Sequence, residues 1–192
     1  MSLPRLIPAA LIALMPLAAG AEQAFDATTG PRIADYRAPV PGSVPGCRVP
    51  DAETVAAMTG GGALLIDAMA APGHAITSDG AWIIAAPHQT IPDAHWLPEI
   101  GRGRADPRIA AGLRKSLEGC TGRPLVLFRN TGCWIGWNGV QHGAALRQRD
   151  IGWYPGGVDD WADAGRALQP VDPLPIGASL CGMDAAPRPA LN

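Results

Sequence analysis

The chain has 192 residues and a formal net charge of −2, with 15 basic residues (Lys and Arg) against 17 acidic ones. This near balance gives no reason to expect a nucleic-acid partner, which would require a strongly basic surface. Gly and Pro contribute 24 and 20 residues, so we expect long loops and extended arms around a modest core.

The first 21 residues have the pattern of an export signal. Arg5 supplies a positive charge, Leu6–Ala19 is apolar but too short to span a bilayer, and Ala19–Ala21 fits a small-residue cleavage site. A retained membrane anchor is the alternative, which the short apolar run disfavours. We therefore expect a signal peptide at 1–21, a periplasmic location, and no membrane association after cleavage.

The rest of the chain divides by composition into three parts. Residues 22–50 are proline-rich without apolar periodicity, which predicts an extended N-terminal arm; a disordered linker is the alternative. Residues 51–168 carry the periodic segments of one domain, and residues 169–192 form a proline-rich C-terminal tail.

Helices and short apolar strands alternate along residues 51–168. A first predicted helix covers Ala52–Met58 after the cap Asp51, and a second starts at Asp106-Pro107 and has Ile109, Leu113 and Leu117 on one face. A third follows Cys133 and reaches about Arg149, and a short fourth runs from Asp159 or Asp160 to Gly165. Predicted strands are Ala63–Ile66, Leu125–Phe128 and Ile151–Tyr154, with a short one at Trp82–Ile84. Thr90–Pro98 is expected to be a rigid turn. This alternation predicts an α/β fold with a central, mainly parallel sheet.

The stretch Pro124–Trp137 has the geometry in which α/β proteins place their chemistry. Its strand is followed by the polar loop Arg129–Gly132 and then by a helix that begins after Cys133. The loop is therefore expected at the carboxyl edge of the sheet, facing the positive end of a helix dipole. Such a position holds anions and makes a thiol more acidic.

Four cysteines, Cys47, Cys120, Cys133 and Cys181, follow the signal. An oxidising compartment permits disulfides, and four cysteines allow three full pairings. A bond between Cys120 and Cys133 is disfavoured, because they flank one strand and should lie at opposite edges of the sheet. The other pairings stay open.

His74, His88 and His95 lie within one irregular segment. Their spacing does not match that of metal ligands, and no cluster of cysteines or carboxylates joins them. We interpret them as surface or packing histidines and expect no metal site.

Several segments resemble the landmarks of rhodanese domains. They are Ala63–Asp67, Thr90–Ala94, Leu125–Gly132 and Trp153–Gly165, which are similar in turn to the strand ending in Ile-Asp, the Ile-Pro-Gly-Ala turn, the active-site loop and the closing Gly-Gly…Trp…Ala-Gly segment of that family. Asp93 stands where the family's turn usually has Gly. The resemblance implies a rhodanese-like α/β fold with helices on both faces of the sheet.

Four further segments resemble a narrower group, the exported CXXCW-motif proteins associated with pyrroloquinoline quinone (PQQ)-dependent alcohol catabolism. They are Asp35–Pro41, His95–Pro98, Cys133–Asn138 and Trp153–Pro155. Both resemblances together cover roughly Asp35 to Leu168. The implied partner is an exported quinoprotein dehydrogenase or a cytochrome, and the implied candidate ligand is PQQ.

The loop departs from both patterns. A rhodanese has its nucleophilic cysteine where this chain has Arg129, and the CXXCW pattern requires its first cysteine where this chain has Asn130. Only Cys133 and Trp134 remain of the motif. The resemblance therefore implies neither a two-cysteine redox pair within the loop nor ordinary persulfide chemistry.

Three functions remain open at this point. The first is an accessory or binding protein that holds a small anion such as PQQ with Arg129, Asn130, Thr131, Gly132 and Trp134. The second is a thiol-dependent sulfurtransferase or redox protein with Cys133 as its nucleophile. The third is a partner-binding module. Five tryptophans lie in the family-like segments, and several of them would form an aromatic rim beside the loop, whereas Trp161, and next Trp153, are better interpreted as core residues; the five are Trp96, Trp134, Trp137, Trp153 and Trp161. Covalent c-type haem is excluded, because the sequence has no Cys-x-x-Cys-His.

Overall fold

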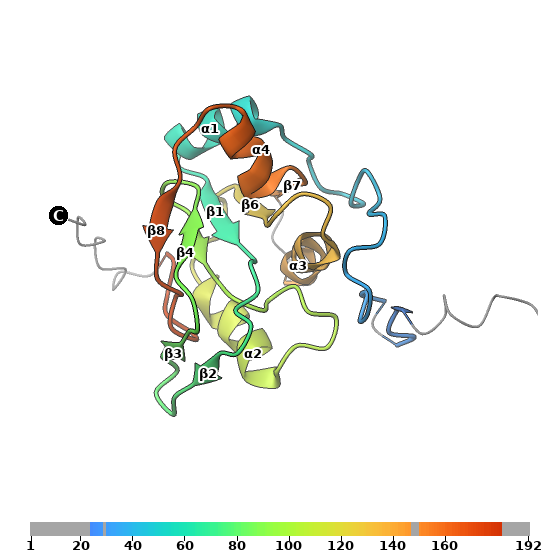
Figure 1. The fold of residues 1–192 in the computed structure, drawn as a ribbon, viewed down its shortest axis with the longest axis vertical. Coiled ribbons are helices and arrows are strands. Elements are labelled where there is room, and N and C mark those ends of the chain that lie inside the picture. Colours follow the sequence, from blue (N-terminus) through green and yellow to red (C-terminus); the bar gives the residue numbers. More distant parts are fainter. Residues whose placement is uncertain (1–23, 29, 147–149, 182–192) are drawn as a thin grey trace, which may run out of the picture.

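The computed structural model describes residues 24–28, 30–146 and 150–181. The predicted signal peptide and residues 182–192 of the predicted tail lie outside this part. Figure 1 shows a central sheet with helices packed above and below it.

The central sheet has four parallel strands. β5 (His95–Trp96), β1 (Leu64–Asp67), β6 (Leu125–Phe128) and β7 (Ile151–Tyr154) lie side by side in this order. The three longer strands are buried along their whole length, which explains their uninterrupted apolar sequences. The predicted α/β class with a parallel sheet is confirmed. The edge strand β5 falls within the segment predicted to be a turn. It could not be predicted as a strand, because two residues between prolines are too few to show a strand periodicity.

Helices cover both faces of this sheet, as expected. α1 (Ala52–Gly60) and α4 (Gly157–Asp163) lie on one face, and α2 (Pro107–Ser116) and α3 (Trp134–Ala145) on the other. Alternate strand residues enter the two cores. Leu65, Val126, Phe128 and Tyr154 pack with Val55 and Trp161, while Leu64, Ile66, Leu125 and Leu127 pack with Ile109, Leu113 and Val140.

The predicted helix starts agree with the structure for α1 and α2. The Asp51 carboxylate accepts a hydrogen bond from the Thr54 N–H at 2.8 Å, and that of Asp106 accepts one from the Arg108 N–H at 2.8 Å. α3 ends at Ala145, where the Leu146 N–H bonds to the carbonyl groups of His142 and Gly143. Residues 147–149 of the predicted helix lie outside the described residues. α4 begins at Gly157, before the expected start at Asp159 or Asp160.

The N-terminal arm is folded onto the domain. The Arg48 N–H donates to the Ile151 carbonyl at 3.1 Å, and the Trp153 N–H donates to the Arg48 carbonyl at 2.8 Å. Arg48 therefore continues the sheet beyond β7 as an isolated parallel bridge to Gly152. The described part of the arm is thus an ordered extension of the domain rather than a loose linker.

The C-terminal segment crosses the opposite side of the domain. β8 (Gln169–Val171) pairs antiparallel with β4 (His88–Thr90), beside the small hairpin of β2 (Ala75–Ile76) and β3 (Trp82–Ile83). The Leu174 N–H then donates to the Trp96 carbonyl at 2.8 Å. Strand β4 could not be predicted, because its partner lies about 80 residues later in the chain.

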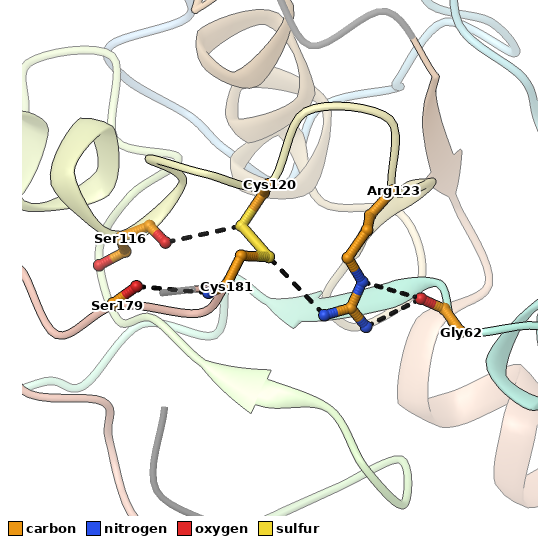
Figure 2. Close-up of a disulfide and its surroundings, with 6 residues drawn as sticks. All are labelled: Gly62, Ser116, Cys120, Arg123, Ser179 and Cys181. Atoms are coloured by element: carbon orange, nitrogen blue, oxygen red, sulfur yellow. Dashed lines mark hydrogen bonds between the residues drawn. A yellow bond between two sulfur atoms is a disulfide. The ribbon is translucent and has the colours of Figure 1, made fainter. Parts of the chain in front are cut away.

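A disulfide fixes the end of this segment. Cys181 is bonded to Cys120, just after α2, with the two Cα atoms 5.1 Å apart (Figure 2). Next to it, the Arg123 guanidinium donates two hydrogen bonds to the Gly62 carbonyl, at 3.1 and 2.8 Å. The pairing that the sequence left open is therefore Cys120–Cys181, and Cys47 and Cys133 are free thiols.

Within the described residues, none of the helices has the length and apolar character needed to cross a bilayer.

Candidate functional site

The loop between β6 and α3 lies at the carboxyl edge of the sheet, as the sequence predicts. Asp67 and Phe128 are register partners on neighbouring parallel strands, so Asp67 and Arg129 end their strands at the same edge. The Ala68 N–H donates to the Phe128 carbonyl at 2.9 Å and extends the pairing to this edge. Asp67 and the predicted loop residues are thus brought to one side of the molecule.

Arg129 and Cys133 form a pair within the loop. Nη1 of Arg129 donates to Sγ of Cys133, which is only 4% exposed and occupies the N-cap position of α3. Nε of Arg129 is buried and has no hydrogen-bond partner among the described residues. The guanidinium thus faces the thiol, and one of its N–H groups is left without a partner.

The loop rests on a close backbone contact with Gly157. The Val158 N–H donates to the Arg129 carbonyl at 3.0 Å, and Asn130 forms an antiparallel bridge with Gly157. Gly157 has φ 56°, and a Cβ atom there would lie 1.4 Å from the Arg129 carbonyl oxygen. Only glycine fits at this contact, which gives the second glycine of Pro155-Gly156-Gly157 its structural role.

A carboxylate of the chain itself already occupies the loop. Asp159 accepts from Asn130 Nδ2 and from the Thr131 N–H, both at 2.9 Å, and the Thr131 hydroxyl donates to the Gly156 carbonyl at 2.7 Å. Two of the residues expected to donate to an external anion, Asn130 and Thr131, are therefore already bonded to Asp159 of α4 and to Gly156 just before it. The sequence pattern predicts Asp159 only as a helix start, because nothing in the sequence links it to a loop 28 residues earlier.

The N-terminal arm covers the other side of the loop. The Trp134 N–H donates to the Tyr36 carbonyl at 3.0 Å, and the indole Nε1 of Trp134 donates to the Pro39 carbonyl at 3.1 Å. Arg37 Nη1 donates to the Thr131 carbonyl at 3.3 Å. The first N–H of α3 is thus taken by the arm, while Thr131 and Gly132 stay exposed. The ligand-binding role of Arg129, Asn130, Thr131, Gly132 and Trp134 stays a prediction.

A second polar cluster lies at the end of β1. Asp67 is fully buried and accepts from the Thr90 hydroxyl at 2.6 Å and from the Met69 N–H at 2.8 Å. Nε2 of His88 lies 2.7 Å from the same carboxylate, and its ring packs on Trp96 with centroids 4.6 Å apart. His88 is therefore a packing histidine that gives a buried carboxyl group a hydrogen-bond partner. Among the described residues, no three His, Cys, Asp or Glu side chains are grouped as metal ligands.

The tryptophans do not form an exposed rim beside the loop. Trp161 and Trp153 are buried, as the core interpretation predicts, and Trp96 and Trp134 are buried as well. Trp137 is half-buried and donates its indole N–H to the Ser43 carbonyl at 3.0 Å. These rings fill the cores and attach the arm to the domain. Large apolar rings stabilise a small domain most when they are buried away from water.

Comparison with known proteins gives one partial likeness in fold. No family model and no curated protein matches the chain. Among solved structures, the chain is similar to a thiosulfate sulfurtransferase from Pseudomonas aeruginosa, with 22% sequence identity and a TM-score of 0.46. The likeness covers 74% of this chain and 22% of that chain, so this protein spans about a fifth of that protein's length.

Proposed function

We propose that this chain is an exported, rhodanese-like accessory or binding protein associated with PQQ-dependent alcohol oxidation, and that it has no working sulfurtransferase site. One observation carries the proposal. Where a rhodanese-type loop needs an open cysteine, this loop has Arg129, whose guanidinium lies against a cysteine that is 4% exposed. A cysteine that is buried below the protein surface cannot readily contact a sulfur donor or acceptor.

The geometry of Asp93 supports the rhodanese-like part of the proposal. Asp93 stands at the position of a family glycine and has φ 63°, in the left-handed region that glycine favours. Aspartate is among the side chains that tolerate this conformation best. The turn therefore keeps the backbone shape that its resemblance to the family requires, with a substitute residue.

The disulfide supports the export part. Bonds such as Cys120–Cys181 persist in oxidising compartments and are rare in the cytosol. Together with the signal pattern at 1–21, this favours a periplasmic protein whose partner is an exported quinoprotein dehydrogenase or cytochrome.

The proposed ligand is an anion of the PQQ type, which carries several carboxylates. To reach the Thr131 N–H, an incoming carboxylate has to replace Asp159. Binding would therefore exchange one carboxylate for another, and the closed loop would be the ligand-free state. A charge-assisted contact with Arg129 would contribute about 1.5–3 kcal/mol.

Calorimetric titration with PQQ and with simple dicarboxylates tests this ligand. Arg129→Ala should weaken binding by about 10-fold to 150-fold, and Arg129→Lys should restore it only partly, because lysine makes no bidentate contact. Asp159→Ala should strengthen binding, since the competing carboxylate is gone. If the wild type binds none of these ligands, or Arg129→Ala binds them equally well, the anion site is refuted.

The enzymatic part is tested with thiosulfate and cyanide, measuring thiocyanate. We expect no turnover above background. Turnover comparable to that of a rhodanese with a loop cysteine, lost in Cys133→Ser, would overturn the proposal.

The contact between Arg129 and Cys133 favours one alternative, a thiol protein that uses Cys133. One guanidinium N–H of Arg129 donates to the sulfur of Cys133, which places a cationic group against this thiol. Titration of the folded, unreduced protein with Ellman's reagent distinguishes the two. A fast-reacting thiol that survives in Cys47→Ser and disappears in Cys133→Ser would support the alternative, and slow reaction at Cys133 supports the accessory role.

A further inference from the structure

A hollow of about 580 Å³ opens between α2 and α3. Its apolar lining includes Ile109 and Leu113 from α2, Leu146 at the end of α3, and Ile100 from the segment between β5 and α2. The start of the N-terminal arm, at Asp26 and Pro31, closes one side. Sites for small organic molecules have this size and this mainly apolar lining. None of the β6–α3 loop residues lines it, so the inference does not depend on the function proposed above.

The polar groups around this hollow are mostly basic. Arg104, Arg114 and His142 line it together with one carboxylate, that of Asp26. Asp26 pairs with Nε of Arg104 at 3.2 Å, so one acid and one base offset each other. Arg114 is exposed and has no ion pair or side-chain hydrogen bond among the described residues. Its charge is therefore free for a ligand in a chain whose net charge is negative.

His142 presents a second unused polar atom. Its Nδ1 lies 2.8 Å from the Ile100 carbonyl oxygen, and a carbonyl only accepts, so Nδ1 carries the proton. Nε2 has no partner within the described part of the chain. This nitrogen accepts a hydrogen bond when the imidazole is neutral and donates one when it is protonated. Arg114 and His142 come from the last turns of α2 and α3, so two helices contribute to one site.

Hydrogen bonds hold in place the side of the hollow that is formed by the N-terminal arm and the segment before α2. Asn138 of α3 is fully buried, and its Nδ2 donates to the Arg32 carbonyl at 2.8 Å and to the Gly101 carbonyl at 3.0 Å. Its Oδ1 accepts from the Arg32 N–H at 3.1 Å. The Gly103 N–H, on the same side, donates to the Tyr36 hydroxyl at 3.2 Å. These bonds hold the arm and the segment before α2 in place, so the hollow is formed before any ligand arrives.

We propose that this hollow binds a small organic carboxylate with an apolar ring body. The ring would lie against Ile100, Ile109, Leu113 and Leu146, and the carboxylate would reach Arg114 at the rim. His142 Nε2 would contact a polar substituent or the carboxylate itself. A fully apolar ligand would leave the basic rim unused, and an inorganic anion would leave the apolar lining exposed to water.

Calorimetric titration of the intact chain with 2-naphthoate tests the proposal, with the uncharged 2-naphthalenemethanol as the matched ligand. We expect 2-naphthoate to bind about tenfold or more tightly than the alcohol, which corresponds to one charge-assisted contact. In the wild type, 2-naphthoate should also shift the imidazole signals of His142 in NMR spectra. No binding at millimolar 2-naphthoate, or equal binding of both ligands, would overturn the proposal.

Three variants locate the site. Arg114→Ala should lower the affinity for 2-naphthoate about tenfold and leave that for the alcohol unchanged. Lys115→Ala is the matched control, because Lys115 is also a basic residue in the last turn of α2 but lines a different hollow. Ala110→Trp places a ring in the hollow from an exposed helix position and should abolish binding of both ligands. The proposal is wrong if Arg114→Ala and Lys115→Ala weaken 2-naphthoate equally, or if Ala110→Trp binds like the wild type. Thermal melts of each variant establish that it is folded.

Discussion

The side chain of Asn138 connects three segments by hydrogen bonds. Both of its amide hydrogens and its oxygen are bonded, to the main chain of Arg32 and of Gly101, and the side chain is fully buried. A buried amide with all of these bonds made is stable, but its removal leaves buried main-chain groups without partners. The residue therefore joins the N-terminal arm to α3 and to the segment before α2.

We predict that Asn138→Ala lowers the free energy of unfolding by about 3 kcal/mol, because three main-chain groups lose their partner. Urea unfolding followed by tryptophan fluorescence measures the change. Asn130→Ala is the control, since Asn130 lies in the half-exposed loop and makes one side-chain bond, to Asp159; it should cost less than about 1 kcal/mol. Equal losses in the two variants would contradict this connecting role.

At the residue scale, the sequence predicted where residues lie along the sheet better than it predicted which side chains contact one another. The common edge of Asp67 and Arg129 follows from the strand pattern alone, and the structure confirms it. The contacts of Asp159 with the loop and of His88 with Asp67 could not be predicted. Each joins residues more than 20 positions apart through side chains whose types are common on surfaces.

At the scale of elements, local chemistry specifies the helix starts. The pKa of Asp106 is held below its ordinary value of 3.8, first by the hydrogen bond from the Arg108 side chain and then by the Arg108 N–H. Asp51 at the start of α1 has a lowered pKa for the same kind of reason, its hydrogen bonds with Thr54. The sequence pattern does not predict the short strands β5 and β4. They are strands because they pair with distant segments, and they have no local pattern of their own.

The caps predict how stability depends on pH. A carboxyl group whose folded pKa is depressed adds stability that is present above its unfolded pKa and is lost as the pH falls through the folded pKa. The contribution of Asp106 should therefore be present above the ordinary aspartate pKa of about 4 and decrease as the pH falls below it. In Asp106→Asn, which keeps a capping oxygen but cannot titrate, the thermal midpoint should fall less over this range.

A series of thermal melts across that pH range tests this cap. Asp163→Asn is the control, because Asp163 is exposed and accepts no hydrogen bond from a described residue. Its pH profile should follow that of the wild type. If Asp106→Asn also follows the wild type, the cap does not contribute to the acid sensitivity.

At the scale of the whole molecule, two end segments enclose one α/β domain. The arm adds to the sheet beside β7, and the C-terminal segment pairs with β4 and then crosses β5, so neither edge of the four-stranded sheet is left open. The sequence predicted the alternating core of the fold from periodicity. It could not predict how these proline-rich ends pack, because they carry no periodicity and their contacts are with distant parts of the chain.

The disulfide determines how firmly the C-terminal segment is held. Between β8 and Cys181, the segment is held by single hydrogen bonds, such as that from the Leu180 N–H to the Ser116 carbonyl at 2.9 Å, and by Ile176, whose side chain packs against Gly112 of α2. Cys120 and Cys181 are separated by 61 positions, so their bond removes much freedom from the unfolded chain. The loop-entropy model gives a contribution of about 4 kcal/mol for a loop of this length.

We therefore predict that dithiothreitol lowers the free energy of unfolding of the wild type by about 4 kcal/mol, measured by urea unfolding with and without the reductant. The double variant Cys120→Ala, Cys181→Ala should resemble the reduced wild type and should not respond to the reductant. Cys47→Ser, which removes a free thiol, should respond as fully as the wild type. The reduced protein should also be cleaved sooner by protease between Gln169 and Cys181, because the segment opens while the sheet persists. If reduction changes neither stability nor cleavage, the segment is held by its packing on α2 and β5 rather than by the disulfide.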